Sequence, residues 1–191
     1  PPAIVWFRRD LRLDDNPALD AASRSGAPVL PLFILDPDEM PGAASLWWLH
    51  HSLASLAAAL QSRGAPLILR RGRPADILPR LIAETGAKAI YWNRCYEPHA
   101  VARDKALKSA LAEKGVGVES FNGSLLAEPW QVKTGSGDPY KVFTPFWRAL
   151  SQQPFDAPLA APSKIRAAAP VGSDALEDWN LLPVKPDWAG G

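Results

Sequence analysis

The chain has 191 residues, of which 47% are hydrophobic, and its formal net charge at neutral pH is +1. Such a balance excludes a polybasic nucleic-acid binder, so any contact with a polyanion must depend on local patches. The only cysteine, Cys95, excludes an internal disulfide and fits a reducing compartment. No apolar run approaches the about 20 residues that span a bilayer, so the sequence predicts a soluble, cytoplasmic protein without membrane contact.

The first expected element is a short strand at residues 4–7, Ile-Val-Trp-Phe. Its β-branched and aromatic residues are typical of a strand that is covered on both faces. A charged cluster at residues 8–12 follows at once. Asn16 is a good helix N-cap and Pro17 suits the first helical position, so a helix is predicted from residue 17 to about residue 25.

Strands and helices then alternate along the chain. The other expected strands are residues 29–35, 67–69, 89–92 and 118–121, and the other expected helices are residues 46–60, 77–85 and 99–114. Their connections are too long for hairpins and suit crossovers. The sequence therefore predicts an α/β fold with a doubly wound, five-stranded parallel sheet of the Rossmann-like type. Pro31 is unexpected within the second strand, because proline belongs at an edge, a strand start or a bulge.

Beyond the last expected strand the chain loses its periodicity. Residues 1–124 are predicted to form the α/β domain, and residues 125–191 an irregular extension that serves as an interdomain linker or wrapping arm. A short helix is expected after Pro145. Four tryptophans of the extension are candidates for docking on a partner domain: Trp130, Trp147, Trp179 and Trp188.

Chemistry is expected at the carboxyl ends of the strands, where open α/β sheets bind ligands at the point of strand-order reversal. If the first and fourth strands flank that point, the predicted ligand residues are Arg8, Arg9, Asp10, Asp36, Asn93 and Glu97. Guanidinium groups, carboxylates and aromatic walls suit a planar, polar ligand. For Arg9 and Asp10, ligand contact and an internal salt bridge stay equally open.

Several other site types lose support. Neither a Gly-x-Gly-x-x-Gly motif nor a Walker motif occurs, which argues against ordinary dinucleotide or nucleoside triphosphate binding. His50, His51 and His99 show no ligand spacing, so no metal site is predicted. Trp47 and Trp48 are adjacent on the second helix, so only one can face the sheet and the other is free to cover a ligand crevice. No catalytic residue is predicted in the chain.

Four segments of the sequence resemble the DNA photolyase and cryptochrome family. They are residues 6–19 (Trp-Phe-Arg-Arg-Asp-Leu-Arg-Leu-Asp-Asp-Asn-Pro-Ala-Leu), residues 43–53, residues 92–98 with Arg103 and Asp104, and residues 140–147. They follow one another in the family's order and cover the chain. The similarity is to the amino-terminal α/β domain, and the start of the interdomain linker, of the family's bacterial cyclobutane-pyrimidine-dimer photolyases.

The resemblance implies that the complete enzyme has two domains with different roles. The complete enzyme carries FAD in a larger helical domain, which is expected to lie outside these 191 residues and to bind DNA containing pyrimidine dimers. That domain splits the flipped-out dimer in a light-driven reaction. The α/β domain serves as a platform and hosts a second, light-harvesting chromophore, which is methenyltetrahydrofolate, a deazaflavin or FMN. By this resemblance the chain alone is inactive, the full protein is a lyase, and a monomer is expected.

Two positions depart from the family's pattern. Folate-binding members hold the pterin with an Asn-Glu pair at the start of the fourth helix, where this sequence has His99 and Ala100. Leu46 stands where an arginine commonly precedes the paired tryptophans. His99 is kept as a candidate ligand residue, and a domain without an antenna remains an alternative. Two further functions stay open, the same domain of a cryptochrome photosensor and a free-standing nucleotide-binding module.

Overall fold

The structure, a computed structural model, describes residues 1–185 and contains one parallel sheet. The strands are β1 (Ala3–Phe7), β2 (Val29–Leu35), β3 (Ile68–Arg71), β4 (Ala89–Asn93) and β5 (Gly117–Phe121). The helices are α1 (Pro17–Arg24), α2 (Ala43–Ser62), α3 (Pro74–Thr85), α4 (Pro98–Ala112) and α5 (Phe143–Leu150), with short 3-10 turns η1 (Pro37–Glu39) and η2 (Glu177–Trp179). The strand order is β3-β2-β1-β4-β5, and every pairing is parallel. The predicted doubly wound sheet is confirmed.

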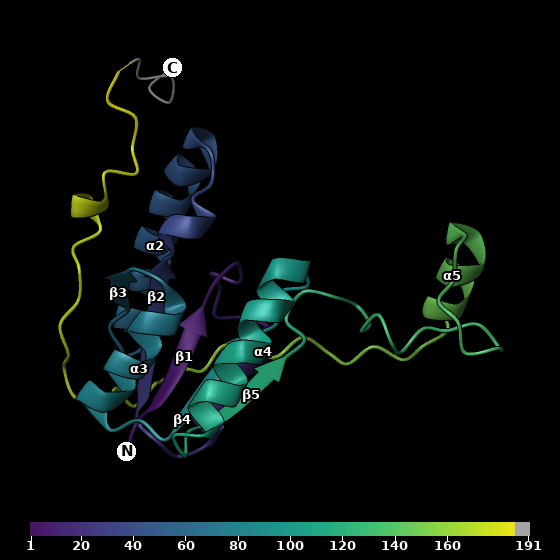
Figure 1. The fold of residues 1–191 in the computed structure, drawn as a ribbon, viewed down its shortest axis with the longest axis horizontal. Helices are drawn as coiled ribbons and strands as arrows, with labels where there is room; N and C mark the ends of the chain where they lie inside the picture. Colours follow the sequence, from purple (N-terminus) through teal and green to yellow (C-terminus); the bar gives the residue numbers. More distant parts are fainter. Residues whose placement is uncertain (186–191) are drawn as a thin grey trace.

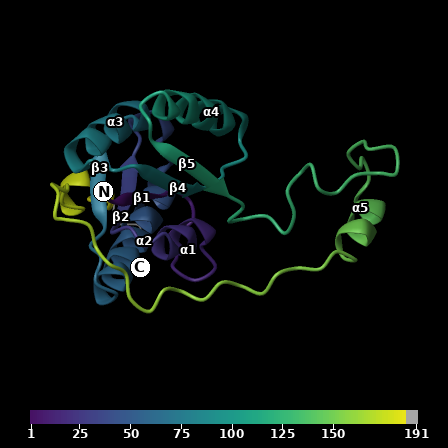
Figure 2. The ribbon, with the colours of Figure 1, turned by 90° about the horizontal axis from the view of Figure 1, so that it is seen from below.

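Helices cover both faces of the sheet. Figure 2 shows α1 and α2 along one face and α3 and α4 along the other. Because side chains alternate along a strand, Val5 and Phe7 of β1 enter the core on the α1 and α2 side, while Ile4 and Trp6 enter the opposite core. All five residues of β1 are buried. This two-sided burial explains the continuous apolar run in the sequence.

The position of Pro31 has a local explanation. Val5 of β1 pairs with Pro31, whereas the pairing of β2 with β3 begins only at Leu32. The backbone of Val29 points to the β3 side, where it bonds to residues 166 and 168 of the returning chain. Alternation places the Pro31 nitrogen on that same side, in the gap between this bridge and β3. A missing N–H there breaks no ladder hydrogen bond, so the proline is tolerated away from a sheet edge.

The returning segment, residues 159–182, is built into the domain. Its backbone bonds to that of β2 and β3, and Ile165, Trp179 and Leu181 join the core on the α1 and α2 side. Trp179 is only 6% exposed, packs against Phe33, and donates from its indole nitrogen to Asp174 at 3.2 Å. The expectation that Trp179 docks on a partner domain is therefore wrong. A domain boundary after residue 124 includes the whole sheet but leaves out this returning segment, hereafter the strap, although its side chains belong to the core.

The middle of the extension extends away from the sheet. Figures 1 and 2 show α5 well separated from the rest, joined to it by two extended stretches. Phe143 and Trp147 of α5 are exposed, as are Val142 just before the helix and Trp130, whereas Leu150 at its end is buried. Trp188, the fourth predicted docking residue, lies outside the described residues. Within residues 1–185, no helix combines the length and the apolar composition needed to cross a bilayer.

Candidate functional site

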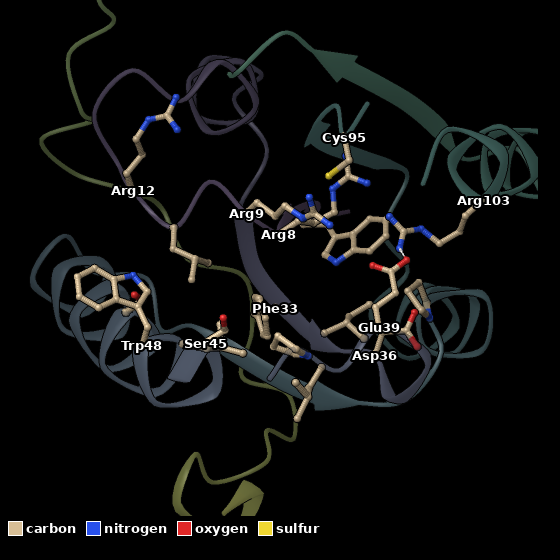
Figure 3. Close-up of a pocket in the computed structure, with 18 residues that line it drawn as sticks. Arg8, Arg9, Arg12, Phe33, Asp36, Glu39, Ser45, Trp48, Cys95 and Arg103 are labelled. Carbon is tan, nitrogen blue, oxygen red and sulfur yellow. Dashed lines mark hydrogen bonds and ion pairs between the residues drawn. The ribbon is translucent and has the colours of Figure 1, made fainter. Parts of the chain in front are cut away.

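A cavity of about 700 Å³ opens at the carboxyl ends of β1 and β2. The strand order reverses between β1 and β4, so the cavity lies beside the reversal point where the sequence predicted a ligand site. Its walls come from residues that follow β1, from the end of β2 with η1, from the first half of α2, and from Arg103 of α4. Figure 3 shows arginines on one side of this space and the α2 side chains across from them.

One face of α2 forms the wall opposite the arginines. Ser45, Trp48, Leu49 and Ser52 all line the cavity. Their spacing of three, four and seven residues places them on one side of a helix. Trp48 is 68% exposed there, whereas the ring of Trp47 contacts His51 at a centroid distance of 4.5 Å. Of the two adjacent tryptophans, Trp48 is the one positioned to cover a ligand.

Beneath the arginines lies a buried polar network that ties β1, α1 and β4 together. Asn93 donates from Nδ2 to Asp10 Oδ2 at 2.6 Å and to Asn16 Oδ1 at 2.8 Å. Asn16 caps α1 by accepting from the Leu19 amide, and Asn93 accepts from the Ala18 amide one position earlier. Asp10 also accepts from the Arg8 amide at 2.8 Å. The network satisfies the first turn of α1 and fixes the backbone from which the arginines project.

Gly123 closes this network on the β5 side. A Cβ atom built at Gly123 would lie 2.5 Å from Cγ of Asn93, so no side chain fits without displacing the amide. The carbonyl of Gly123 accepts a hydrogen bond from Arg12 at 2.5 Å. The chain after β5 therefore approaches β4 closely at the reversal point, and glycine permits it.

Arg8 is held as part of the wall. Its guanidinium donates to both carboxylate oxygens of Asp104, at 2.7 and 2.9 Å, and to the carbonyl of Asn93. It also lies 4.8 Å from the ring centroid of Trp6 and 5.7 Å from that of Trp92. The side chain is only 7% exposed. This buried, paired and stacked guanidinium stabilises the floor of the cavity and has limited freedom to bind a ligand.

Arg9 lies at the rim and is far more open. Its side chain is 63% exposed and pairs with Glu97, the N-cap residue of α4. The backbone amide of Glu97, with Arg9 as a further contribution, lowers the pKa of the Glu97 carboxyl. Such an exposed pair contributes little to stability. Arg9 is therefore free to exchange this partner for an anionic ligand group.

Other charges complete the rim. Arg103 of α4 pairs with Glu39 of η1, and His99 lies 3.6 Å from the same carboxylate. Asp36 lines the cavity and also caps η1 by accepting from the Asp38 amide. Within residues 1–185, no three His, Cys, Asp or Glu side chains are arranged to hold a metal ion.

The predicted ligand residues thus separate into three groups. Arg8, Arg9 and Asp36 line the cavity. Asp10 and Asn93 are buried, at 8% and 3% exposure, and act on the site by fixing its backbone. Glu97 and His99 lie beyond the cavity lining, with Glu97 reaching the site only through Arg9.

Sequence reasoning missed other lining residues. They include Leu11, Phe33, Glu39, Ser45, Ser52 and Arg103. Arg12, which belongs to the charged cluster expected after the first strand, and Trp48, whose role was left open, also line the cavity. The helical spacing of Ser45, Trp48 and Ser52 in α2 was a readable signal, because it puts two hydroxyls and an indole on one stripe. Arg103 gave no such signal, since its place at the rim depends on how α4 crosses the sheet.

Cys95 follows β4 and also lines the cavity. Burial raises the pKa of its thiol, and the nearby Arg8 guanidinium opposes this only in part. The thiol is therefore protonated near neutral pH. A protonated thiol is a poor nucleophile, so Cys95 serves as a neutral wall residue.

Comparison with known proteins assigns the chain to a family. The family model for DNA photolyase matches residues 3–163. The chain belongs to the DNA photolyase family. A deoxyribodipyrimidine photo-lyase of Agrobacterium fabrum is 50% identical in an alignment that covers 98% of this chain and 40% of that protein. Cryptochrome-1 of Arabidopsis thaliana is 44% identical in an alignment that covers 85% of this chain and 25% of that protein.

Solved structures of photolyase-family members share the fold. A bacterial class III photolyase from Agrobacterium tumefaciens superposes with a TM-score of 0.95 at 49% identity, covering 99% of this chain and 40% of that chain. A cryptochrome of Synechocystis sp. PCC6803 superposes with a TM-score of 0.85 at 25% identity, covering 96% of this chain and 41% of that chain. The photolyase-family chain thus spans well under half the length of these relatives.

Proposed function

We propose that the chain is the α/β domain of a longer, FAD-dependent DNA photolyase that repairs pyrimidine dimers with light. In this proposal the domain holds a light-harvesting second chromophore, and the repair chemistry belongs to a helical domain of the same protein. The observation that carries it is the cavity beside the β1–β4 reversal, with aromatic and guanidinium walls, in a chain half identical to a photo-lyase.

The cavity fits a planar, polar chromophore. Its volume of about 700 Å³ lies within the usual range for small-molecule sites. Phe33 and Trp48 offer apolar faces, Arg9 and Arg12 offer donors for anionic groups, and Asp36 offers an acceptor. When bound, such a chromophore absorbs light and passes the excitation to the flavin. The residues of this chain contribute by binding it, orienting it and shielding its ring from water.

The positions of His99 and Leu46 favour the cavity, rather than the start of α4, as the place where the chromophore binds. His99, at the position where folate-binding members hold the pterin, is outside the cavity lining, and its side chain is 59% exposed. Leu46, at the position of the missing arginine, packs against the core. We therefore expect the chromophore, whether a folate, a deazaflavin or FMN, to lie between Arg9 and Trp48.

The exposed extension suits a partner domain. Val142, Phe143 and Trp147 are exposed around α5, which protrudes from the sheet in Figure 1. An exposed apolar cluster of this kind marks an interaction surface. We propose that it docks on the FAD-bearing helical domain of the same protein. The photolyase then acts as a monomer that contacts DNA through that helical domain.

Light-dependent repair by the full-length protein tests the proposal. The purified protein should carry FAD and convert a dimer-containing oligonucleotide to the undamaged strand only under illumination. Residues 1–191 alone should repair nothing. Repair by residues 1–191 without the rest of the protein would contradict the assignment of the repair chemistry to the helical domain.

A cryptochrome photosensor is the second candidate, favoured by the 44% identity to a plant cryptochrome. It predicts FAD binding without dimer repair in the same assay. A free-standing nucleotide-binding module predicts instead that residues 1–191 alone bind an adenine nucleotide. Titration of that piece with ATP and AMP separates this outcome from the other two.

A further inference from the structure

A second cavity, of about 390 Å³, lies on the other face of the sheet between α4 and the strands β4 and β5. In Figure 1, α4 runs beside β5 along this side of the domain. Val101, Lys105, Lys108 and Ser109 of α4 line one wall. Their spacing of three to four residues puts them on one stripe of the helix. Ser120 of β5 contributes to the opposite wall.

The charges around this cavity do not balance. Arg94 pairs with Glu128, and Asp104 is already bound by Arg8 and Arg103. Neither Lys105 nor Lys108 has an ion-pair partner among residues 1–185. Two ammonium groups without an ion-pair partner therefore line the same cavity, where the nearest carboxylate, that of Asp104, is already paired with two arginines.

Lys108 is the more constrained of the two lysines. Its Nζ donates to Ser120 Oγ at 2.6 Å and lies 5.8 Å from the ring centroid of Trp92. Burial lowers the pKa of Lys108, and repulsion from Arg94 lowers it further, while the carboxylate of Asp104 opposes these effects only in part. A negative charge placed in the cavity would offset both effects. The buried indole N–H of Trp92, another lining residue, has no hydrogen-bond partner among the described residues.

We propose that this second cavity binds a small dianionic phosphate ester, with Lys105 and Lys108 holding the phosphate. Two ammonium groups match the two charges of a phosphate monoester at neutral pH. Ser109 of α4 and Ser120 of β5 supply hydroxyl groups from the two walls. The volume exceeds that of a phosphate group alone, and Val101, which is 50% exposed, provides apolar surface for the organic part of the ester. This site shares one lining residue, Cys95, with the first cavity but is lined otherwise by different residues, and the proposal does not depend on the proposed photolyase function.

Calorimetric titration of the full-length protein with phenyl phosphate, at constant ionic strength, tests the proposal. We expect saturable binding that Lys108→Gln weakens about tenfold or more, since a hydrogen bond to a charged group is lost. Lys105→Gln should weaken binding by a smaller factor. Lys114→Gln is the matched control, because Lys114 is an exposed lysine just beyond α4 and outside the cavity lining, and it should change nothing.

A second readout follows the lysine itself. In NMR titrations of the lysine Cε resonances, phenyl phosphate should raise the pKa of Lys108, and at constant pH it should leave the chemical shift of the Lys114 resonance unchanged. Equal affinity of the Lys108→Gln and Lys114→Gln proteins would overturn the proposal. The proposal would also be overturned if an oligonucleotide displaced phenyl phosphate more effectively than inorganic phosphate does, when both are compared at the same concentration of phosphate groups. In that case the bound phosphate belongs to a nucleic acid.

Discussion

Replacing Asn93 by alanine should destabilise the protein strongly, although Asn93 does not line the cavity at the ends of β1 and β2. Its amide is 3% exposed and joins Asp10, Asn16 and the first turn of α1. The alanine variant leaves a buried carboxylate without its closest donor and the Ala18 amide without its acceptor. Few single positions connect three elements in this way.

The magnitude follows from the bonds that are lost. The hydrogen bond from Asn93 to the Asp10 carboxylate, at 2.6 Å, accounts for about 1.5–3 kcal/mol. Loss of the acceptor for the α1 amide adds about 1 kcal/mol, as for other helix caps. Because these groups share one network, we expect a combined loss of about 3–4 kcal/mol.

Urea unfolding followed by circular dichroism measures this loss, and hydrogen exchange at the Ala18 amide locates it. Asn122→Ala is the matched control, because Asn122 bonds to residues 124 and 125 of its own loop and to the Tyr96 hydroxyl at 3.3 Å, but takes no part in the network around Asp10. The control should lose about 1 kcal/mol. If Asn93→Ala is no less stable than Asn122→Ala, or if the Ala18 amide keeps its protection, the network does not hold the site together.

Three further predictions concern the same edge of the sheet. Gly123→Ala should cost about 1–3 kcal/mol in the free energy of unfolding by overpacking against Asn93. Gly135→Ala is its control, since nothing lies within 4 Å of an added Cβ there. Arg9→Ala should change the free energy of unfolding by less than about 1 kcal/mol, because its ion pair is exposed. Cys95 should react with iodoacetamide more slowly than a free thiol near pH 8.5, and its rate should rise as the pH passes the raised pKa.

For each of these three predictions there is an outcome that would contradict it. Equal unfolding midpoints for the two glycine variants would show that the backbone at residue 123 relaxes freely. If the Arg9→Ala protein unfolds at a much lower urea concentration than the parent, the Arg9–Glu97 pair is a structural salt bridge, which is the alternative that the sequence left open. Alkylation of Cys95 at the rate of the urea-unfolded protein would show that its thiol is not buried.

Sequence patterns predicted the sheet well because its determinants are local. The apolar runs, the glycines after the helices and the N-cap at Asn16 each mark an element within a few residues. They also predicted a ligand site beside the reversal between the first and fourth strands, where the structure has a cavity. The fate of individual polar residues was harder to predict. Asp10 and Arg9 are neighbours in the sequence, yet one is buried in a network and the other is 63% exposed.

The reason lies in contacts between distant residues. Asp10 is buried because Asn93 and Asn16 meet it, and no sequence period records that meeting. Trp179 was expected at an outer surface because its segment lacks periodicity, but the strap returns to pack it against Phe33. Whether an irregular segment packs on the domain depends on contacts with distant residues. Its composition alone therefore does not distinguish a packed strap from a free linker.

The central claim is that the cavity between Arg9 and Trp48 holds a light-harvesting chromophore. The most direct measurement is the identity and amount of the pigments released when the purified full-length protein is denatured, for the parent, Trp48→Ala and Trp130→Ala proteins. Trp130 is also an exposed tryptophan but lies outside the cavity lining, so it is the matched control. We predict a second pigment beside FAD in the parent and the control, and its loss with FAD retained in Trp48→Ala. A parent protein that releases FAD alone, or a Trp48→Ala protein that keeps the second pigment, would contradict the account.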